Sequence, residues 1–313
     1  MRIAVYLPLV LPLLLVPFTR ATADRMPPRA AAWLLTVAAL ALAVCSALVT
    51  GLVVLAGVAQ LPPVARLGHW SVHAVRHALD PGASLIAVGG AAVILAAVVA
   101  VGRVLVRHVR AMEGGRSALR GLARDCELVV LPEERPVAYA LPGRPAHVVV
   151  STGMLSALDA GERRALLAHE RAHLSGRHHL ITTATRVAAM VNPLLRPLHR
   201  AAAYAVERWA DEAAARQVGD RRVTARAIAK AALASRDAPA GDAALLAATT
   251  GPVPRRIMAL LSPRVREGPP VRSPAAVAAV AAVATLVASA AATLEATTDL
   301  HALLEVAQVA MAR

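Results

Sequence analysis

The chain has 313 residues, of which 57% are hydrophobic, and its mean hydropathy is +0.56. The length suits one domain plus a membrane region, and the composition argues against an ordinary soluble enzyme. The formal net charge of +14 could indicate nucleic acid binding, but only 2% of the residues are aromatic and no recognised binding motif occurs. Direct nucleic acid binding is therefore not expected, and arginine beside apolar segments is better explained by membrane topology.

Four apolar segments are candidates for membrane spans, since a crossing helix needs about 20 mostly apolar residues. They are residues 3–18, 31–55, 84–106 and 275–294. The first is short, and Ala21-Thr22-Ala23 resembles a signal-peptide cleavage site, although Arg20 directly before it argues against cleavage. Backbone that faces lipid must satisfy its own hydrogen bonds, so we expect all four segments to be helical.

The loop between the second and third segments carries His69, His73 and His77 at helical spacing. This stripe could sense external metal or acid. An interfacial amphipathic helix with an ordinary polar face is the favoured interpretation. The two cysteines, Cys45 and Cys126, lie in an apolar and a polar segment, so we expect neither a disulfide nor a metal site from them.

Arginine is concentrated in three regions that share one side of the membrane if the N-terminus is outside. These are Arg20, Arg25 and Arg29 after the first segment; Arg103, Arg107, Arg110, Arg116, Arg120 and Arg124 after the third; and Arg264, Arg266 and Arg272 before the fourth. The positive-inside rule then places residues 111–268 in the cytoplasm and both termini outside. We therefore expect a multi-pass cell-membrane protein with a membrane region over 1–110, a cytoplasmic domain, and a fourth span with a short extracellular tail over 269–313.

Three short strands are predicted after the third span, at Glu127–Leu131, Val137–Leu141 and His147–Val150, with turns at Pro132 and Pro142-Gly143. They indicate a small sheet ahead of the next helix. An edge strand of this sheet could pair with an extended substrate backbone.

His169-Glu170-Arg171-Ala172-His173 has the pattern H-E-x-x-H, within a helix predicted to start at Asp159 and end at Gly176. Residues four apart share a helix face, so the two imidazoles converge on one point. Imidazole is a favoured Zn²⁺ ligand, and Glu170 can accept a proton from a metal-bound water.

A second predicted helix supplies carboxylates. Glu207 and Asp211 are four residues apart and face the same way, so Glu207 is the predicted third ligand and Asp211 a hydrogen-bond acceptor for a ligand histidine. The apolar segment 180–195 between the two helices could dip into the membrane. We favour a helix packed under the site, because both metal-binding helices must lie in the same compartment.

Together these motifs resemble the gluzincin core of membrane peptidase families M48 and M56. The runs that carry the resemblance are residues 136–144, 148–155, 167–174 and 207–211, and residues 255–261 resemble the segment that follows the catalytic core. One departure is Arg177-His178-His179, where relatives often carry an aspartate shortly after the second zinc histidine. These histidines could be spare ligands or transition-state donors, but solvent-facing positions at a helix end are the favoured interpretation. Candidates for stabilising the oxyanion are Tyr204, His178 and His179.

Three spans before the catalytic domain and one after it resemble the M56 sensor-transducers more than the M48 heat-shock proteases. Only residues 295–313 follow the fourth span, so the penicillin-binding sensor domain of antibiotic sensors is not expected. The resemblance implies a mainly α-helical membrane protein with an α+β gluzincin-like zinc peptidase domain and one Zn²⁺ per chain. The expected function is regulatory cleavage of a cytoplasmic protein such as a winged-helix repressor, with self-cleavage also open. The alternatives are an M48-like quality-control protease and a non-catalytic, metal-binding membrane sensor.

Overall fold

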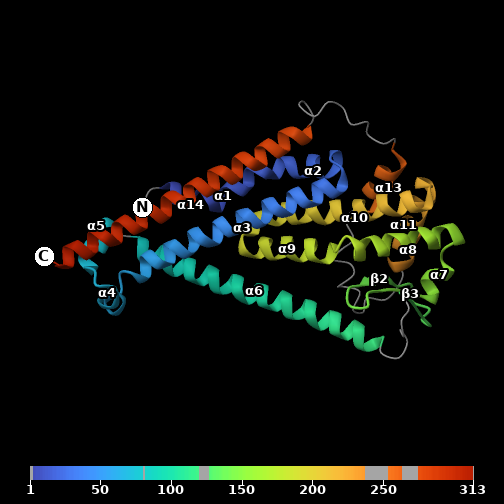
Figure 1. Ribbon diagram of the computed structural model, residues 1–313, viewed down its shortest axis with the longest axis horizontal. Helices are drawn as coiled ribbons and strands as arrows, with labels where there is room; N and C mark the ends of the chain where they lie inside the picture. Colours follow the sequence, from blue (N-terminus) through green and yellow to red (C-terminus); the bar gives the residue numbers. More distant parts are fainter. Residues whose placement is uncertain (1–2, 80–81, 120–126, 237–252, 263–273, 313) are drawn as a thin grey trace.

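The computed structural model describes residues 3–79, 82–119, 127–236, 253–262 and 274–312. Long helices run side by side along most of the molecule, and a small sheet lies towards one end (Figure 1). Within the described residues, four helical segments are long and apolar enough to cross a membrane: Leu7–Arg25, Pro28–Val58, Ala83–Ala118 and Ala276–Ala312. The predictions of a mainly helical fold and of apolar helices in these regions are confirmed. Cys126 and the basic residues at 120, 124, 264, 266 and 272 lie outside the described residues.

Proline breaks the first apolar segment. The segment consists of the 3-10 turn η1 (Ile3–Tyr6), α1 (Leu7–Val10), the 3-10 turn η2 (Leu11–Leu15) and α2 (Val16–Arg25). Pro12 has no N–H to donate to the carbonyl of Pro8, four residues earlier. Ser46 of α3 (Pro28–Val58) supplies the missing donor, because its Oγ donates to that carbonyl at 3.1 Å. The break is thus satisfied inside the bundle, as it would have to be if this segment crossed a membrane.

The loop after α3 folds into two short helices, α4 (Pro62–Gly68) and α5 (Val72–Ala78), which precede the long helix α6 (Ala83–Ala118). His69 ends α4 in the left-handed conformation, with a φ of 54°, and the Ser71 side chain caps the start of α5. The prediction of a single stripe of three histidines is therefore wrong. His73 and His77 share α5, with ring centroids 4.3 Å apart, but the left-handed turn separates His69 from them.

The last helix, α14 (Pro274–Ala312), continues past residue 294, where the fourth span was predicted to end. Residues 295–312 contain neither Gly nor Pro to stop the helix, and Leu300 packs against Val75 of α5. The Ser71 backbone N–H also donates to the carbonyl of Ala307 at 2.9 Å. The predicted tail is thus a helix that packs against the segment formed by α4 and α5.

The predicted three-stranded sheet is confirmed. It consists of β1 (Leu128–Leu131), β2 (Ala138–Leu141) and β3 (His147–Ser151) in the order β1-β3-β2. The central strand β3 is buried throughout; it pairs in parallel with β1 and antiparallel with β2. This order makes β2 an edge strand, and β2 packs against the helix that carries the H-E-x-x-H motif.

Helix α10 links the two parts of the molecule. The helices after the sheet are α7 (Thr152–Ser156), α8 (Ala160–Ser175), α9 (His178–Val191), α10 (Arg196–Val218), α11 (Arg221–Arg236) and α13 (Val253–Leu261), with the 3-10 turn η3 (Pro193–Leu195) between α9 and α10. Helix α10 packs against α3 on one side and against α8 on another. It therefore connects the apolar helices directly to the helix with the predicted metal ligands.

The hairpin formed by α9, η3 and α10 lies among the apolar helices. One buried cluster joins η2, α3, α9, α10 and α14 and includes Leu15, Leu42, Ala188, Leu198 and Ala282. At the turn, Asn192 Nδ2 donates to Ser46 Oγ at 3.0 Å and to the carbonyl of Leu9 at 3.1 Å. The segment 180–195 is thus a helix packed beside α10, and its far end reaches into the apolar bundle.

Candidate metal centre

Helix α8 is capped and anchored at its N-terminus. Asp159 accepts from the Glu162 backbone N–H at 2.8 Å, and the Glu162 side chain accepts from the Asp159 N–H at 3.0 Å, which completes a capping box. Glu162 is fully buried, and its carboxylate pairs with Lys230 of α11 at 2.7 Å. The cap and the ion pair hold the helix that carries His169 and His173.

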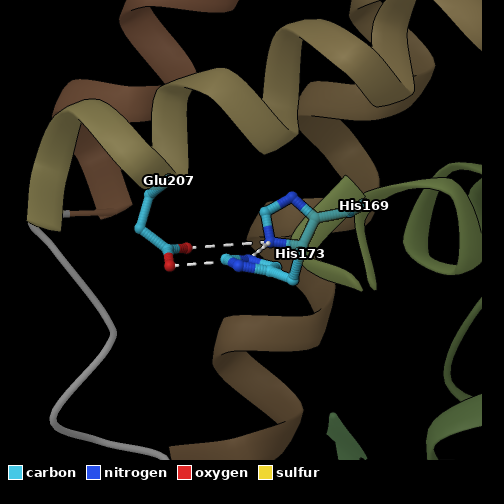
Figure 2. Close-up of side chains that lie close together, drawn as sticks. All are labelled: His169, His173 and Glu207. Atoms are coloured by element: carbon cyan, nitrogen blue, oxygen red, sulfur yellow. Dashed lines mark hydrogen bonds and ion pairs between the residues drawn. The ribbon is translucent and has the colours of Figure 1, made fainter. Parts of the chain in front are cut away.

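The side chains of His169, His173 and Glu207 meet between α8 and α10, as Figure 2 shows. The Nε2 atoms of the two histidines lie 3.1 Å apart. The Glu207 oxygens lie 3.7 Å from His169 Nε2 and 3.6 Å from His173 Nε2. His169 and Glu207 are buried, and His173 is half-buried. The structure therefore brings the three predicted ligands to one point.

These separations fit a zinc ion. Bond lengths of about 2.0–2.1 Å in a tetrahedral site place ligand atoms about 3.3 Å apart, close to the three distances above. Two nitrogens and one carboxylate oxygen are also the donor set of a catalytic zinc, which keeps its fourth position open. Among the described residues, no other group of three His, Cys, Asp or Glu side chains comes together in this way.

Two further side chains, those of Asp211 and Arg256, contact the predicted ligands. Asp211 Oδ1 lies 3.0 Å from His169 Nδ1, where the sequence placed it. Arg256 of α13 contacts Glu207 at 2.8 Å and binds Asp211 through two nitrogens, at 2.6 and 2.8 Å. Burial acts to raise the pKa of both carboxyls, but the charges and hydrogen bonds of Arg256 and of the neighbouring histidines together hold each pKa below its usual range. Both groups are therefore carboxylates, the form that a cation requires.

Glu170 lies next to the site on α8. Burial raises its pKa above the usual range for a glutamic acid, although the His169 charge acts in the opposite direction. The Ala140 backbone N–H of the edge strand β2 also faces the carboxylate and acts to lower the pKa. A half-buried carboxyl whose pKa is raised suits a group that accepts and returns a proton.

The family model for Peptidase family M48 matches residues 106–191 of this chain. The match supports an M48-related metallopeptidase. It contains His169, Glu170 and His173 but ends before Glu207, and it names M48, whereas the order of the spans led us to expect M56. No curated protein and no solved structure matches the chain significantly.

The other predicted residues lie apart from the three predicted ligands, with one exception. Tyr204 packs against Leu35 and Ala23 below the Arg255 guanidinium, and His179 stacks on His108 of α6 with centroids 6.3 Å apart. The exception is His178, whose Nδ1 lies 3.0 Å from His173 Nδ1. The interpretation of a solvent-facing position is wrong for this residue, because α9 turns its ring inward and only 1% of it is exposed.

Arg256 is the residue of this site that the sequence did not reveal. It belongs to the segment 255–261, which resembles the segment after the catalytic core of these families. The sequence does not indicate which of the two adjacent arginines points inward. In the structure they diverge: Arg255 pairs with Asp24 of α2, while Arg256 is 4% exposed and binds Glu207 and Asp211.

Substitution Arg256→Gln should lower the free energy of unfolding by about 3–5 kcal/mol, because it leaves two buried carboxylates without their counter-charge. The measurement is denaturant unfolding of the intact protein in detergent. Arg216→Gln is the matched control, since Arg216 is exposed on α10 and has no partner among the described residues. Equal stability of the two variants would contradict this account.

Zn²⁺ binding at this site should release about one proton at pH 6. Burial lowers the pKa of His169, but Asp211 and Glu207 together raise it to about 10, so this imidazole is protonated at pH 6 without metal. Burial lowers the pKa of His173 to about 4, so it is already neutral. A metal ligand must be deprotonated, and the proton of His169 therefore leaves.

The release is measured by titration calorimetry with Zn²⁺ in buffers of different ionisation enthalpy. At pH 6 a zinc-bound water, whose pKa is about 7, stays mostly protonated and contributes little to the measured proton release. Asp211→Asn removes a group that raises the His169 pKa and should reduce the release. An unchanged heat across the buffers would contradict the assignment.

Proposed function

We propose that this protein is an integral-membrane zinc endopeptidase that hydrolyses peptide bonds of a protein substrate on the cytoplasmic side. The observation that carries the proposal is the meeting of His169, His173 and Glu207 at ligand distances, with Glu170 beside them. His169, His173 and Glu207 would hold one Zn²⁺, and Asp211 would orient His169. The bound metal would supply Lewis acidity and lower the pKa of a water molecule.

The remaining chemistry belongs to side chains of the protein. Glu170 accepts the proton of the attacking water and returns it to the leaving amine. Strand β2 lies at an edge of the described sheet, where an extended peptide would add, and Ala140 of this strand faces Glu170. A substrate strand added to β2 would therefore run past the general base.

We also propose the membrane arrangement expected from the sequence: a membrane region over 1–110, a cytoplasmic catalytic part over 111–268 and a last span over 269–313. The exposed Arg103, Arg107 and Arg110 on the second half of α6 support this orientation, since basic residues mark the cytoplasmic side. The favoured role is regulatory, as in M56 proteins, with a cytoplasmic repressor or the chain itself as target.

The test is a comparison of new protein N-termini in cells that carry the wild-type chain and in cells that carry Glu170→Gln. A few cytoplasmic cleavage sites, absent from the variant, would support a regulatory peptidase. Many cleavages in unfolded membrane proteins would favour the quality-control alternative. No difference in N-termini, with the cellular role retained in the variant, would select the metal-binding sensor.

A further inference from the structure

The Nδ1 atoms of His169 and His173 have different partners. His169 Nδ1 lies 3.0 Å from the Asp211 carboxylate. His173 Nδ1 instead lies 3.0 Å from Nδ1 of His178, the first residue of α9, and the two rings are nearly perpendicular, at 87°. His173 therefore meets an imidazole where His169 meets a carboxylate.

The direction of the hydrogen bond follows from the opposite side of the His173 ring. Its Nε2 faces Glu207 at 3.6 Å, which is the side that would bind metal. A nitrogen that binds metal carries no proton, so the ring proton of neutral His173 must be on Nδ1. His173 thus donates, and His178 Nδ1 accepts. An imidazole that accepts at Nδ1 carries its own proton on Nε2 and is uncharged.

The surroundings keep His178 in this form. Its ring is 1% exposed and lies against Trp209 of α10, with ring centroids 4.5 Å apart. Its Nε2 has no hydrogen-bond partner among the described residues. The ring is held by packing and by one hydrogen bond, and no carboxylate of the described residues accepts from its Nε2–H.

Gly176 leaves the space that the ring fills. A Cβ built at this glycine would lie 2.3 Å from His178 Nε2, which is closer than any real contact. The backbone of Gly176 is right-handed, with a φ of −79°, so an alanine could adopt it. An alanine there would displace the His178 ring while leaving the imidazole in the chain.

We infer that His178 is the positioning residue for His173: a neutral imidazole fixes the tautomer and ring orientation of one metal ligand, while a carboxylate does so for the other. This inference rests on the proposed metal site. Outer partners of this kind orient a ligand and set its basicity. A neutral acceptor orients His173 without adding a negative charge to a site that already holds Glu207 and Asp211.

The test measures metal binding rather than peptidase activity. His178→Ala should weaken Zn²⁺ binding about 10- to 100-fold in competition with a chelator, the range found for loss of an outer partner. The visible spectrum of the Co²⁺-substituted protein should also change, because the His173 ring is no longer held. His178→Asp restores an acceptor and should bind Zn²⁺ at least as tightly as the wild type. Gly176→Ala should resemble His178→Ala.

The matched control is His179→Ala, which removes the neighbouring imidazole. This ring stacks on His108 and has no contact with His173, so Zn²⁺ affinity should stay unchanged. Wild-type affinity and an unchanged Co²⁺ spectrum in His178→Ala would overturn the role of His178 and leave the peptidase proposal standing. Failure of the wild-type protein to bind Zn²⁺ would overturn both. Tight, His178-dependent binding without peptide cleavage would overturn only the peptidase.

Discussion

Substitution Glu207→Gln is expected to lower Zn²⁺ affinity by more than about 100-fold, beyond the range for an outer partner. An amide is a neutral and weaker ligand than a carboxylate, and Glu207 supplies the only oxygen among the three ligands. The variant also removes one of the two carboxylates that Arg256 contacts, which leaves a cation beside the site. Zinc content after gel filtration and competition with a chelator would measure the effect.

The control for this variant is Glu113→Gln, which removes an exposed carboxylate on α6. It makes the same chemical change on a residue outside the ligand group and should leave zinc content unchanged. A Glu207→Gln protein that retains one tightly bound zinc per chain would show that the third ligand comes from elsewhere.

The second large effect is expected for Glu170→Gln, which should retain zinc and lose peptidase activity by about 1,000-fold, within the range for a general acid–base group. An amide cannot take the proton of the attacking water, but Glu170 is not among the ligands. The rate would be followed on an unfolded protein such as denatured casein, alongside the zinc content.

Glu127→Gln is the matched control for this second effect. Glu127 pairs at 2.9 Å with Arg171 of α8, the residue that follows Glu170. The Glu127 side chain is exposed and lies outside the site. Its activity should remain near that of the wild type. Undiminished cleavage by the Glu170→Gln enzyme would refute the role of Glu170 as general base.

Features set by neighbouring residues could be predicted from the sequence. The capping box from Asp159 to Glu162 and the spacing of His169 and His173 depend only on helix geometry, and the structure shows the helix expected. The sheet followed from short β-rich runs between turns. The convergence of Glu207 with the histidines was predicted from the chemistry of the pattern, since a site with two imidazoles needs a further ligand.

Features set by distant contacts could not be predicted in this way. The inward direction of Arg256 depends on where α13 docks, and the burial of His178 depends on the Trp209 ring of α10. The hydrogen bonds of Asn192 join residues that are 146 and 183 positions apart, which no local periodicity reports. The left-handed turn at His69 was missed because histidine is not a residue that marks such a turn reliably.

The contact of α10 with the apolar helices determines how the part with the proposed metal site can be isolated. Ala205 and Val206, directly before Glu207, pack against Ala31 and Ala32 of α3, and Leu198 lies in the cluster with Leu42. A water-soluble fragment over residues 127–262 would uncover these faces and the polar side chain of Asn192. We expect such a fragment to aggregate. Biochemical preparations of this protein should therefore retain its N-terminal helices in detergent or nanodiscs.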